Sequence, residues 1–171
     1  MTLLVGPLDS VRALCVARQP ARVVTILSPT QTAPVLPVKV PHLVLGFHDI
    51  DATRSGLVAP DANSLHRLLD FAAAWTEPAP MLVHCWMGIS RSTAASFILA
   101  CAADPNRSEA EIALALRAAS PTATPNQRLI ALADEVLARS GRMIAAIASI
   151  GRGATAACGA PFEFRVRPSQ T

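Results

Sequence analysis

The sequence contains no tyrosine, and only 16% of its 171 residues are charged. Its basic residues are scattered, so they do not favour a nucleic-acid-binding surface. No apolar stretch reaches the ~18 uninterrupted residues typical of a membrane-spanning helix. The first ten residues contain neither lysine nor arginine, which argues against a signal peptide. These absences predict a cytoplasmic protein with neither nucleic acid nor membrane as a partner.

The cysteines also lack a pattern. Cys15, Cys85, Cys101 and Cys158 are not spaced as pairs of metal ligands, and no cluster of His, Asp and Glu has that spacing either. The chain is also too long to be a scaffold held together by disulfides. We therefore expect free thiols in a reducing compartment, no metal and no cofactor.

The residues that are abundant indicate a folded core. Hydrophobic residues make up 51% of the chain, many of them alanine, the mean hydropathy is +0.38, and the net charge is +3. The length suits one domain with a sizeable core, and the mild positive charge slightly favours anionic partners. We expect a single domain over residues 1–150. The Gly- and Ala-rich segment 151–171 has no pattern that predicts a structure, and nothing in the sequence indicates an oligomeric state.

Short apolar runs alternate with helical patterns along the chain, which predicts an α/β fold. Strands are expected at 3–5, 22–28, 42–47 and 81–83. Helices are expected after Asp9 or Ser10, after Asp61, near Arg91, after Ser108, from Asn126 to Gly141, and over 143–150. Ser108 and Glu111 form the S-x-x-E pattern of a capping box. The fully apolar run at 81–83 is typical of a central parallel strand. The resulting architecture is a short, mostly parallel sheet flanked by helices, with the site at the carboxyl end of a central strand.

The stretch VHCWMGISRSTA, residues 83–94, lies where a strand should end and a helix should begin. Backbone N–H groups in such a loop can surround an anion, and the helix N-terminus adds its positive end. Gly88 permits a positive φ and leaves no side chain in the cradle. The residues expected to bind this anion are Trp86, Met87, Gly88, Ile89, Ser90 and Arg91.

The types of side chain in this stretch suit phosphoryl transfer. A helix N-terminus and a nearby arginine favour the thiolate form of Cys85, which can attack a bound phosphoryl group. The planar guanidinium of Arg91 suits two phosphate oxygens and can stabilise them in the transition state. Ser92 can donate a hydrogen bond to the sulfur as it leaves. We expect His84 to order the loop and not to transfer protons.

The segment HCWMGISRS resembles the His-Cys-x5-Arg-Ser/Thr signature of the cysteine-dependent protein tyrosine phosphatase superfamily. The small size and the mid-chain cysteine look like the dual-specificity branch. SPTATPNQRLIAL is similar to the segment in which an asparagine after proline supports the phosphate loop, and Asn126 matches that residue. Leu129 departs from the phenylalanine that is common there. The resemblance covers roughly residues 22–137.

The resemblance also implies a general acid. LGFHD is similar to the strand end that delivers this acid in dual-specificity enzymes, which assigns the role to Asp49. From the residues alone, both aspartates of HDID remain candidates, because Asp49 and Asp51 lie at similar distances along the chain from Cys85. A third aspartate, Asp61, precedes a clear helical pattern and is expected to cap that helix.

Together these features predict a metal-independent phosphate-monoester hydrolase that forms a phosphocysteine intermediate, most simply a protein tyrosine or dual-specificity phosphatase. Its substrate would be a phosphorylated protein or a small phosphate ester. One alternative is an enzyme for a phosphoinositide or inositol phosphate, although no cation stands between Cys85 and Arg91 to neutralise extra phosphates. The other is a module that binds phosphorylated ligands without turnover.

Overall fold

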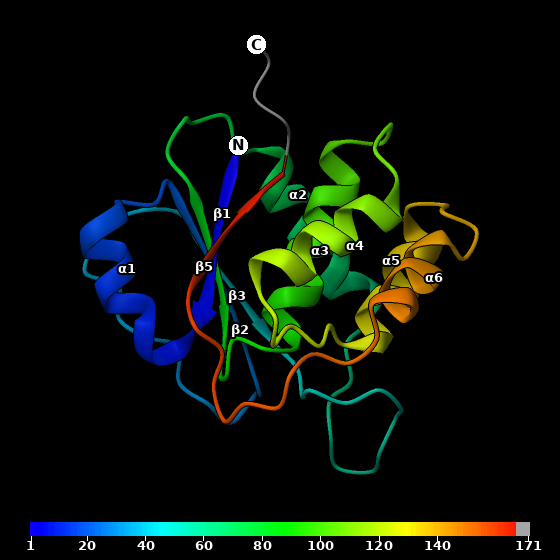
Figure 1. Ribbon diagram of the computed structural model, residues 1–171. Coiled ribbons are helices and arrows are strands. Elements are labelled where there is room, and N and C mark those ends of the chain that lie inside the picture. The colour runs from blue at the N-terminus through cyan, green and yellow to red at the C-terminus, as the bar shows by residue number, and fades with distance from the viewer. Residues whose placement is uncertain (167–171) are drawn as a thin grey trace.

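The computed structural model of the protein describes residues 1–166, which form a sheet with helices on both faces (Figure 1). The strands are β1 (Thr2–Pro7), β2 (Arg22–Leu27), β3 (His42–Gly46), β4 (Met81–Cys85) and β5 (Phe162–Arg165). Their order is β3-β2-β4-β1-β5. The first four are parallel, and β5 runs antiparallel to β1. The α/β fold with a mostly parallel sheet is thus confirmed.

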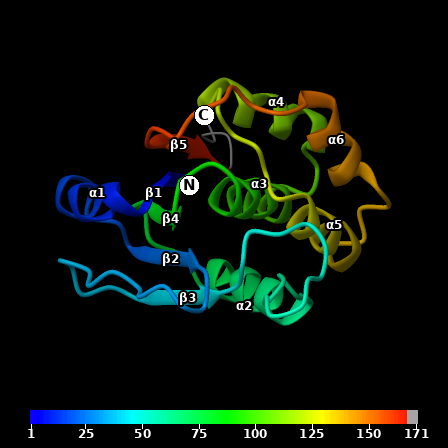
Figure 2. The ribbon, with the colours of Figure 1, turned by 90° about the horizontal axis from the view of Figure 1, so that it is seen from below.

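The helices divide unequally between the two faces of the sheet. They are a short 3-10 turn (Leu8–Ser10), α1 (Val11–Arg18), α2 (Ala62–Ala73), α3 (Arg91–Ala103), α4 (Glu109–Ala119), α5 (Gln127–Val136) and α6 (Arg142–Ile150). Only α1 covers one face, and the other five α-helices gather on the opposite face (Figures 1 and 2). The larger of the two hydrophobic clusters therefore lies between the sheet and α2–α6.

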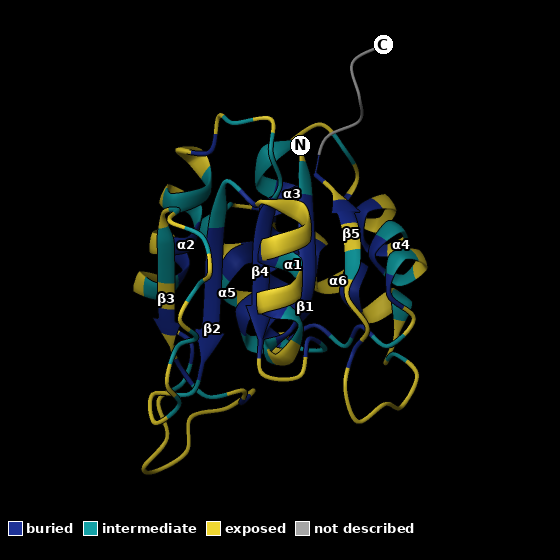
Figure 3. Cartoon of the chain, turned by 90° about the vertical axis from the view of Figure 1, so that its left-hand side faces the viewer, coloured by how far each residue is buried: buried dark blue, intermediate teal, exposed yellow. Residues whose placement is uncertain are grey.

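The centre of the molecule is β4 together with α3. All five residues of β4 are buried, as its uniformly apolar run predicts, and Figure 3 shows the central strands in the colour of buried residues. Every residue of α3 from Arg91 to Cys101 is also buried. The helix can be enclosed in this way because most of these side chains are small or apolar. The loop between β4 and α3 is therefore fixed at both ends by the core.

The parallel register brings the carboxyl ends of the strands together. Pro7 of β1 is level with Cys85 of β4, and Thr25 of β2 is level with His84. Loops that follow β1, β3 and β4 consequently meet at one edge of the sheet. This edge is where open α/β sheets bind ligands.

The expected helix starts differ in how they are capped. The side chains of Asp61 and Asn126 accept the N–H groups of Ser64 and Leu129, as expected for N-caps. Ser108 stands at the N-cap position of α4, as predicted, but its side chain makes no cap hydrogen bond. The predicted hydrogen bond of the capping box was therefore wrong. The adjacent Glu109 instead forms ion pairs with two arginines of a later segment.

The helix expected to run from Asn126 to Gly141 ends earlier, at Val136. Ala138 and Ser140 adopt positive φ angles, and Gly141, at φ 85°, is the N-cap of α6. The carboxylate of Asp134 accepts the N–H groups of Gly141 and Met143. One aspartate in α5 thus holds the start of the next helix, and the turn takes the place of the last helical residues.

Candidate active site

The loop between β4 and α3 has the glycine that its shape requires. Gly88 has φ 70°, in the left-handed region that other residues rarely adopt. A Cβ atom there would lie 2.6 Å from the backbone N of Pro7 and 2.8 Å from the carbonyl C of Gly6. The loop therefore packs closely against the end of β1, and only glycine fits at this position.

Neighbouring segments bind the outer side of the loop through its carbonyl groups. Four loop carbonyls accept backbone N–H groups, in the pairs Leu8 to Trp86, Gly159 to Met87, Thr124 to Ile89, and Asn126 to Ser90. In a trans peptide the C=O and the following N–H point in opposite directions. Outward carbonyls therefore turn the N–H groups of the next residues inward, toward the cradle that an anion would occupy.

The sulfur of Cys85 lies at the base of this cradle. The Gly88 N–H donates to Cys85 Sγ at 3.2 Å, and Ser92 Oγ lies 3.2 Å from the same sulfur. Cys85 is only 2% exposed. Since the α3 N-terminus begins six residues after Cys85, the sulfur faces both hydrogen-bond donors and the positive end of a helix.

Arg91 is buried at the start of α3 and keeps one donor free. Its guanidinium donates to the Phe47 carbonyl oxygen at 3.0 Å, which fixes the side chain under the loop that follows β3. Among the described residues its Nε has no hydrogen-bond partner, and the nearest carboxylate oxygen, Asp49 Oδ2, is 3.9 Å away. A buried donor without a partner is unfavourable unless a ligand satisfies it.

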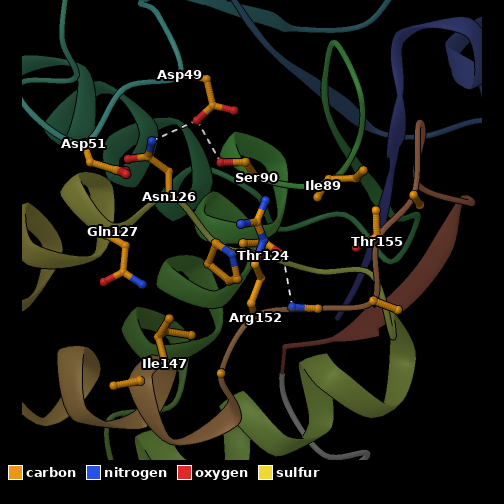
Figure 4. A pocket seen from close by; sticks show the side chains of 16 residues that line it. Asp49, Asp51, Ile89, Ser90, Thr124, Asn126, Gln127, Ile147, Arg152 and Thr155 are labelled. Carbon is orange, nitrogen blue, oxygen red and sulfur yellow. Dashed lines mark hydrogen bonds between the residues drawn. The ribbon is translucent and has the colours of Figure 1, made fainter.

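Asp49 is brought to the loop by two side chains from distant parts of the chain. Its Oδ1 accepts from Ser90 Oγ at 2.7 Å and from Asn126 Nδ2 at 2.8 Å, both drawn as dashed lines in Figure 4. Asp51 is exposed and makes no hydrogen bond or ion pair within residues 1–166. Of the two aspartates of HDID, Asp49 is therefore the one held against the loop.

Asn126 makes four hydrogen bonds that join separate parts of the site. Its side-chain oxygen caps α5, while Nδ2 reaches Asp49 and, at 3.4 Å, the carbonyl oxygen of Ile50. Its backbone N–H donates to the Ser90 carbonyl oxygen at 3.4 Å. The start of α5, the loop after β3 and the loop after β4 are thereby linked through one residue.

His84 lies behind the loop in a chain of hydrogen bonds. Its Nε2 is 2.7 Å from Thr25 Oγ1, which is also 2.7 Å from Nε2 of His42, and its Nδ1 is 3.4 Å from the Cys85 carbonyl oxygen. Burial, the largest effect, and the nearby His42 lower the pKa of His84 from 6.5 to about 4. A neutral His84 that accepts from Thr25 and donates to Cys85 satisfies this chain.

The chain was compared with known proteins. No protein-family model and no curated protein matches it. Among solved structures it is similar to human tyrosine phosphatase-like serine/threonine/tyrosine-interacting protein, with 18% identity over 81% of this chain and 92% of that chain and a TM-score of 0.66. The structure of DUSP15 is 18% identical over 86% of this chain and 89% of that chain, with a TM-score of 0.62. The structure of PTPMT1 in complex with PI(5)P is 21% identical over 81% of this chain and 94% of that chain, with a TM-score of 0.56.

The fold is that of the dual-specificity phosphatases. At these sequence identities the similarity shows only the fold. The roles of individual residues therefore have to be argued from their own contacts and chemistry. Within residues 1–166 this fold contains no group of three His, Cys, Asp or Glu side chains that could hold a metal ion. None of the helices in that range has the length and apolar character to cross a membrane.

Sequence reasoning missed the structure that follows α6. Residues 151–166 pass along the outside of the loop between β4 and α3 and end in β5, while 167–171 lie outside the described residues. The Gly159 N–H donates to the Met87 carbonyl oxygen at 2.8 Å. A Cβ atom at Gly159 would lie 2.8 Å from the carbonyl oxygen of Gly88. In the sequence, only the glycines of this segment indicated its position, because glycine allows close packing against another backbone.

The remaining loop residues differ in exposure. Trp86 and Met87 are 46% and 39% exposed, so their side chains lie on the outer surface and only their backbones belong to the cradle. Ile89 and Ser90 are half-buried and line a cavity of about 550 Å³ beside the loop. The side chains best placed to contact a ligand beyond the cradle therefore belong to this second pair.

Proposed function

We propose that the protein is a phosphate-monoester hydrolase that works through a phosphocysteine intermediate. The observation that carries the proposal is the position of the Cys85 sulfur in a loop whose N–H groups face inward and which ends at Arg91, whose Nε has no partner within residues 1–166. A tetrahedral dianion would satisfy both groups of donors. The likeness to dual-specificity phosphatases supports the same chemistry.

In the first step the Cys85 thiolate attacks phosphorus, and the bond between phosphorus and the ester oxygen breaks. Asp49 gives its proton to the departing oxygen, because an alkoxide or phenolate is a poor leaving group. Arg91 and the loop amides hold the three equatorial oxygens as negative charge develops. The products are the free alcohol or phenol and cysteinyl phosphate.

In the second step water attacks the phosphocysteine. Asp49, now a carboxylate, accepts a proton from this water, and the S–P bond breaks to release inorganic phosphate. Ser92, with its Oγ 3.2 Å from the sulfur, stabilises the returning thiolate by a hydrogen bond. The cycle needs no metal, because the loop and Arg91 supply the positive charge.

The most economical substrate is a phosphorylated protein, with phosphotyrosine as the first candidate. The five residues between Cys85 and Arg91 contain no cation that would neutralise the additional phosphates of a phosphoinositide. PTPMT1, a similar structure, is nevertheless known in complex with PI(5)P, so inositol lipids belong in the test. All four cysteines are free thiols, which supports action in the reducing cytoplasm.

The direct test is to trap the intermediate. The protein is mixed with a ³²P-labelled aryl phosphate in excess chelator and quenched in acid, and labelled peptides are mapped. We expect label on Cys85 and steady release of inorganic phosphate. Binding of phosphate without label or turnover would instead identify a module that binds phosphorylated ligands. A panel of phosphopeptides and phosphoinositides then assigns the substrate class.

A further inference from the structure

A cavity of about 550 Å³ opens beside the phosphate loop, on the side where Asp49 lies (Figure 4). One wall carries Asp49, Asp51 and Ser90, and the opposite wall is the segment 151–156. The start of α5 and the end of α6 close the cavity between them. Its volume is in the range of pockets that bind drug-sized ligands.

The position of the cavity relates it to the leaving group, if the proposed function holds. The scissile phosphate would lie in the loop above Cys85, and the ester oxygen must face its general acid, Asp49. Since Asp49 and Ser90 also line the cavity, the part of the substrate next to that oxygen extends toward it.

The cavity contains an arginine without a partner. Arg152 is exposed, and within residues 1–166 it makes no hydrogen bond and no ion pair. In Figure 4 its side chain rises from the 151–156 segment toward the rim that carries Ser90. The Asp49 carboxylate on that rim already accepts two hydrogen bonds. The guanidinium of Arg152 is thus the cationic group left for a ligand in this cavity.

The backbone that carries Arg152 is fixed on both sides. Gly151 has φ 61°, and its carbonyl oxygen accepts from Arg117 at 2.8 Å. The Gly153 N–H donates to Thr124 Oγ1 at 3.1 Å, and a Cβ atom there would lie 2.5 Å from the carbonyl of Thr122. Arg152 is therefore presented from an anchored position between two glycines, which lowers the entropy lost on binding.

We propose that this cavity is a subsite for a second anionic group of a phosphopeptide substrate, either a carboxylate or a second phosphate next to the phosphorylated residue. The planar fork of Arg152 suits both groups. Asp51 on the opposite wall repels an anion that lies too near it, so the preferred group is the one that reaches Arg152. The proposal rests on the proposed phosphatase activity and adds the sequence context that the enzyme prefers.

The test compares phosphotyrosine peptides that differ at one neighbouring position. Glutamate, phosphoserine or alanine is placed in turn at each of the three positions on either side, and kcat/KM is measured relative to the alanine peptide. At one or more positions the wild type should prefer the anionic peptide by about three- to tenfold, the size expected for a partly exposed charge pair. Concentrated salt should reduce this preference.

Variants of Arg152 decide whether the preference comes from the cavity. Arg152→Ala should bring the ratio close to one, and Arg152→Glu should invert it in favour of the alanine peptide. Arg12→Ala removes the same charge from an exposed position on α1 and should leave the ratio unchanged. Thermal unfolding of each variant shows that the fold is intact. The glutamate and phosphoserine arms separate a carboxylate from a second phosphate as the bound group.

Each failure has a separate meaning. A wild-type ratio near one at every position, or a ratio that Arg152→Ala does not change, overturns the subsite while turnover of an aryl phosphate still supports the enzyme. Absence of turnover with every phosphate ester overturns the proposed function itself. Arg152-dependent hydrolysis of inositol phosphates, with no peptide hydrolysed, overturns the peptide assignment.

Discussion

The two ends of α3 each hold a buried cysteine and a buried arginine, but in opposite surroundings. At the N-terminal end the Cys85 sulfur accepts an N–H, and the nearest carboxylate oxygen to Arg91 is 3.9 Å away. At the C-terminal end Arg139 binds the Cys101 carbonyl oxygen and forms an ion pair with Glu109 at 3.2 Å. Within residues 1–166 the Nε atoms of both arginines lack a hydrogen-bond partner, so the two ends differ in the ion pair and not in this donor.

The difference separates a reactive arrangement from a structural one. Burial, the largest effect, and the nearby Glu109 raise the pKa of Cys101 to about 12, so that thiol stays protonated at neutral pH. Both cysteines are about equally buried, at 2% and 1% exposure. Burial alone therefore does not set the reactivity of a thiol, and the groups around the sulfur decide it.

The largest expected effect is that of removing the proposed nucleophile. Cys85→Ser should lower kcat by about 10⁴-fold or more, because a serine hydroxyl is not ionised in this site. Phosphate affinity should persist, since the loop amides and Arg91 remain. The matched variant Cys101→Ala should keep its turnover and lose only some stability. Steady-state kinetics with an aryl phosphate measures both, and substantial activity in Cys85→Ser would contradict the assignment.

The next comparison is between the carboxylates at the two ends of α3, Asp49 and Glu109. Asp49→Asn should lower kcat by roughly 10²–10⁴ for a poor leaving group, and by less for an activated aryl phosphate that needs little protonation. It should also remove the basic limb of the pH–rate profile. Glu109→Gln should instead reduce the free energy of unfolding by about 3 kcal/mol, because Arg139 is left buried without its carboxylate.

Asp51→Asn, measured beside Asp49→Asn, tests the choice between the two aspartates of HDID. We expect Asp51→Asn to keep the basic limb of the profile, because no hydrogen bond within residues 1–166 holds Asp51 against the loop. If that limb disappears in Asp51→Asn and persists in Asp49→Asn, the general acid lies two positions further along the chain.

Arg91 and Arg139 should also differ, the first affecting mainly kcat and the second mainly the free energy of unfolding. Arg91→Lys keeps the charge but loses the planar fork, so kcat should fall by about two orders of magnitude. Arg139→Lys should leave kcat nearly unchanged and lower the free energy of unfolding by about 1–2 kcal/mol through its lost hydrogen bonds. An Arg91→Lys protein within a few-fold of the wild-type kcat would remove the distinction between the two ends.

The last expected effect concerns the free energy of unfolding as a function of pH, through a histidine behind the loop between β4 and α3. Because the pKa of His84 falls to about 4 in the folded protein, the unfolded chain binds more protons between about pH 4 and 6.5. The free energy of unfolding should therefore decrease as pH falls through this window, by up to about 3 kcal/mol from His84. Urea unfolding at pH 7 and pH 5 measures it, and His84→Asn should flatten the dependence. An equally steep dependence in His84→Asn would assign it to other groups.

The sequence by itself determined the strand–loop–helix that contains Cys85 and Arg91. Residues close together in the chain carry this unit, namely a strand that begins with the apolar run 81–83, a glycine with a positive φ and a helix start. Local patterns of this kind follow from backbone sterics and burial, and they can be read without knowing the rest of the fold. The four parallel strands and most helix starts were predicted for the same reason.

Only the tertiary structure decided how distant residues meet around this loop. Asp49 is joined to Ser90 and Asn126, which are 41 and 77 positions away, and Thr25 meets His84 across 59 positions. The segment after α6, with Arg152 and Gly159, has no periodic pattern, so its place beside the loop was not visible in the sequence. Such contacts depend on strand order and on packing between helices, and a single sequence has no local signal for either.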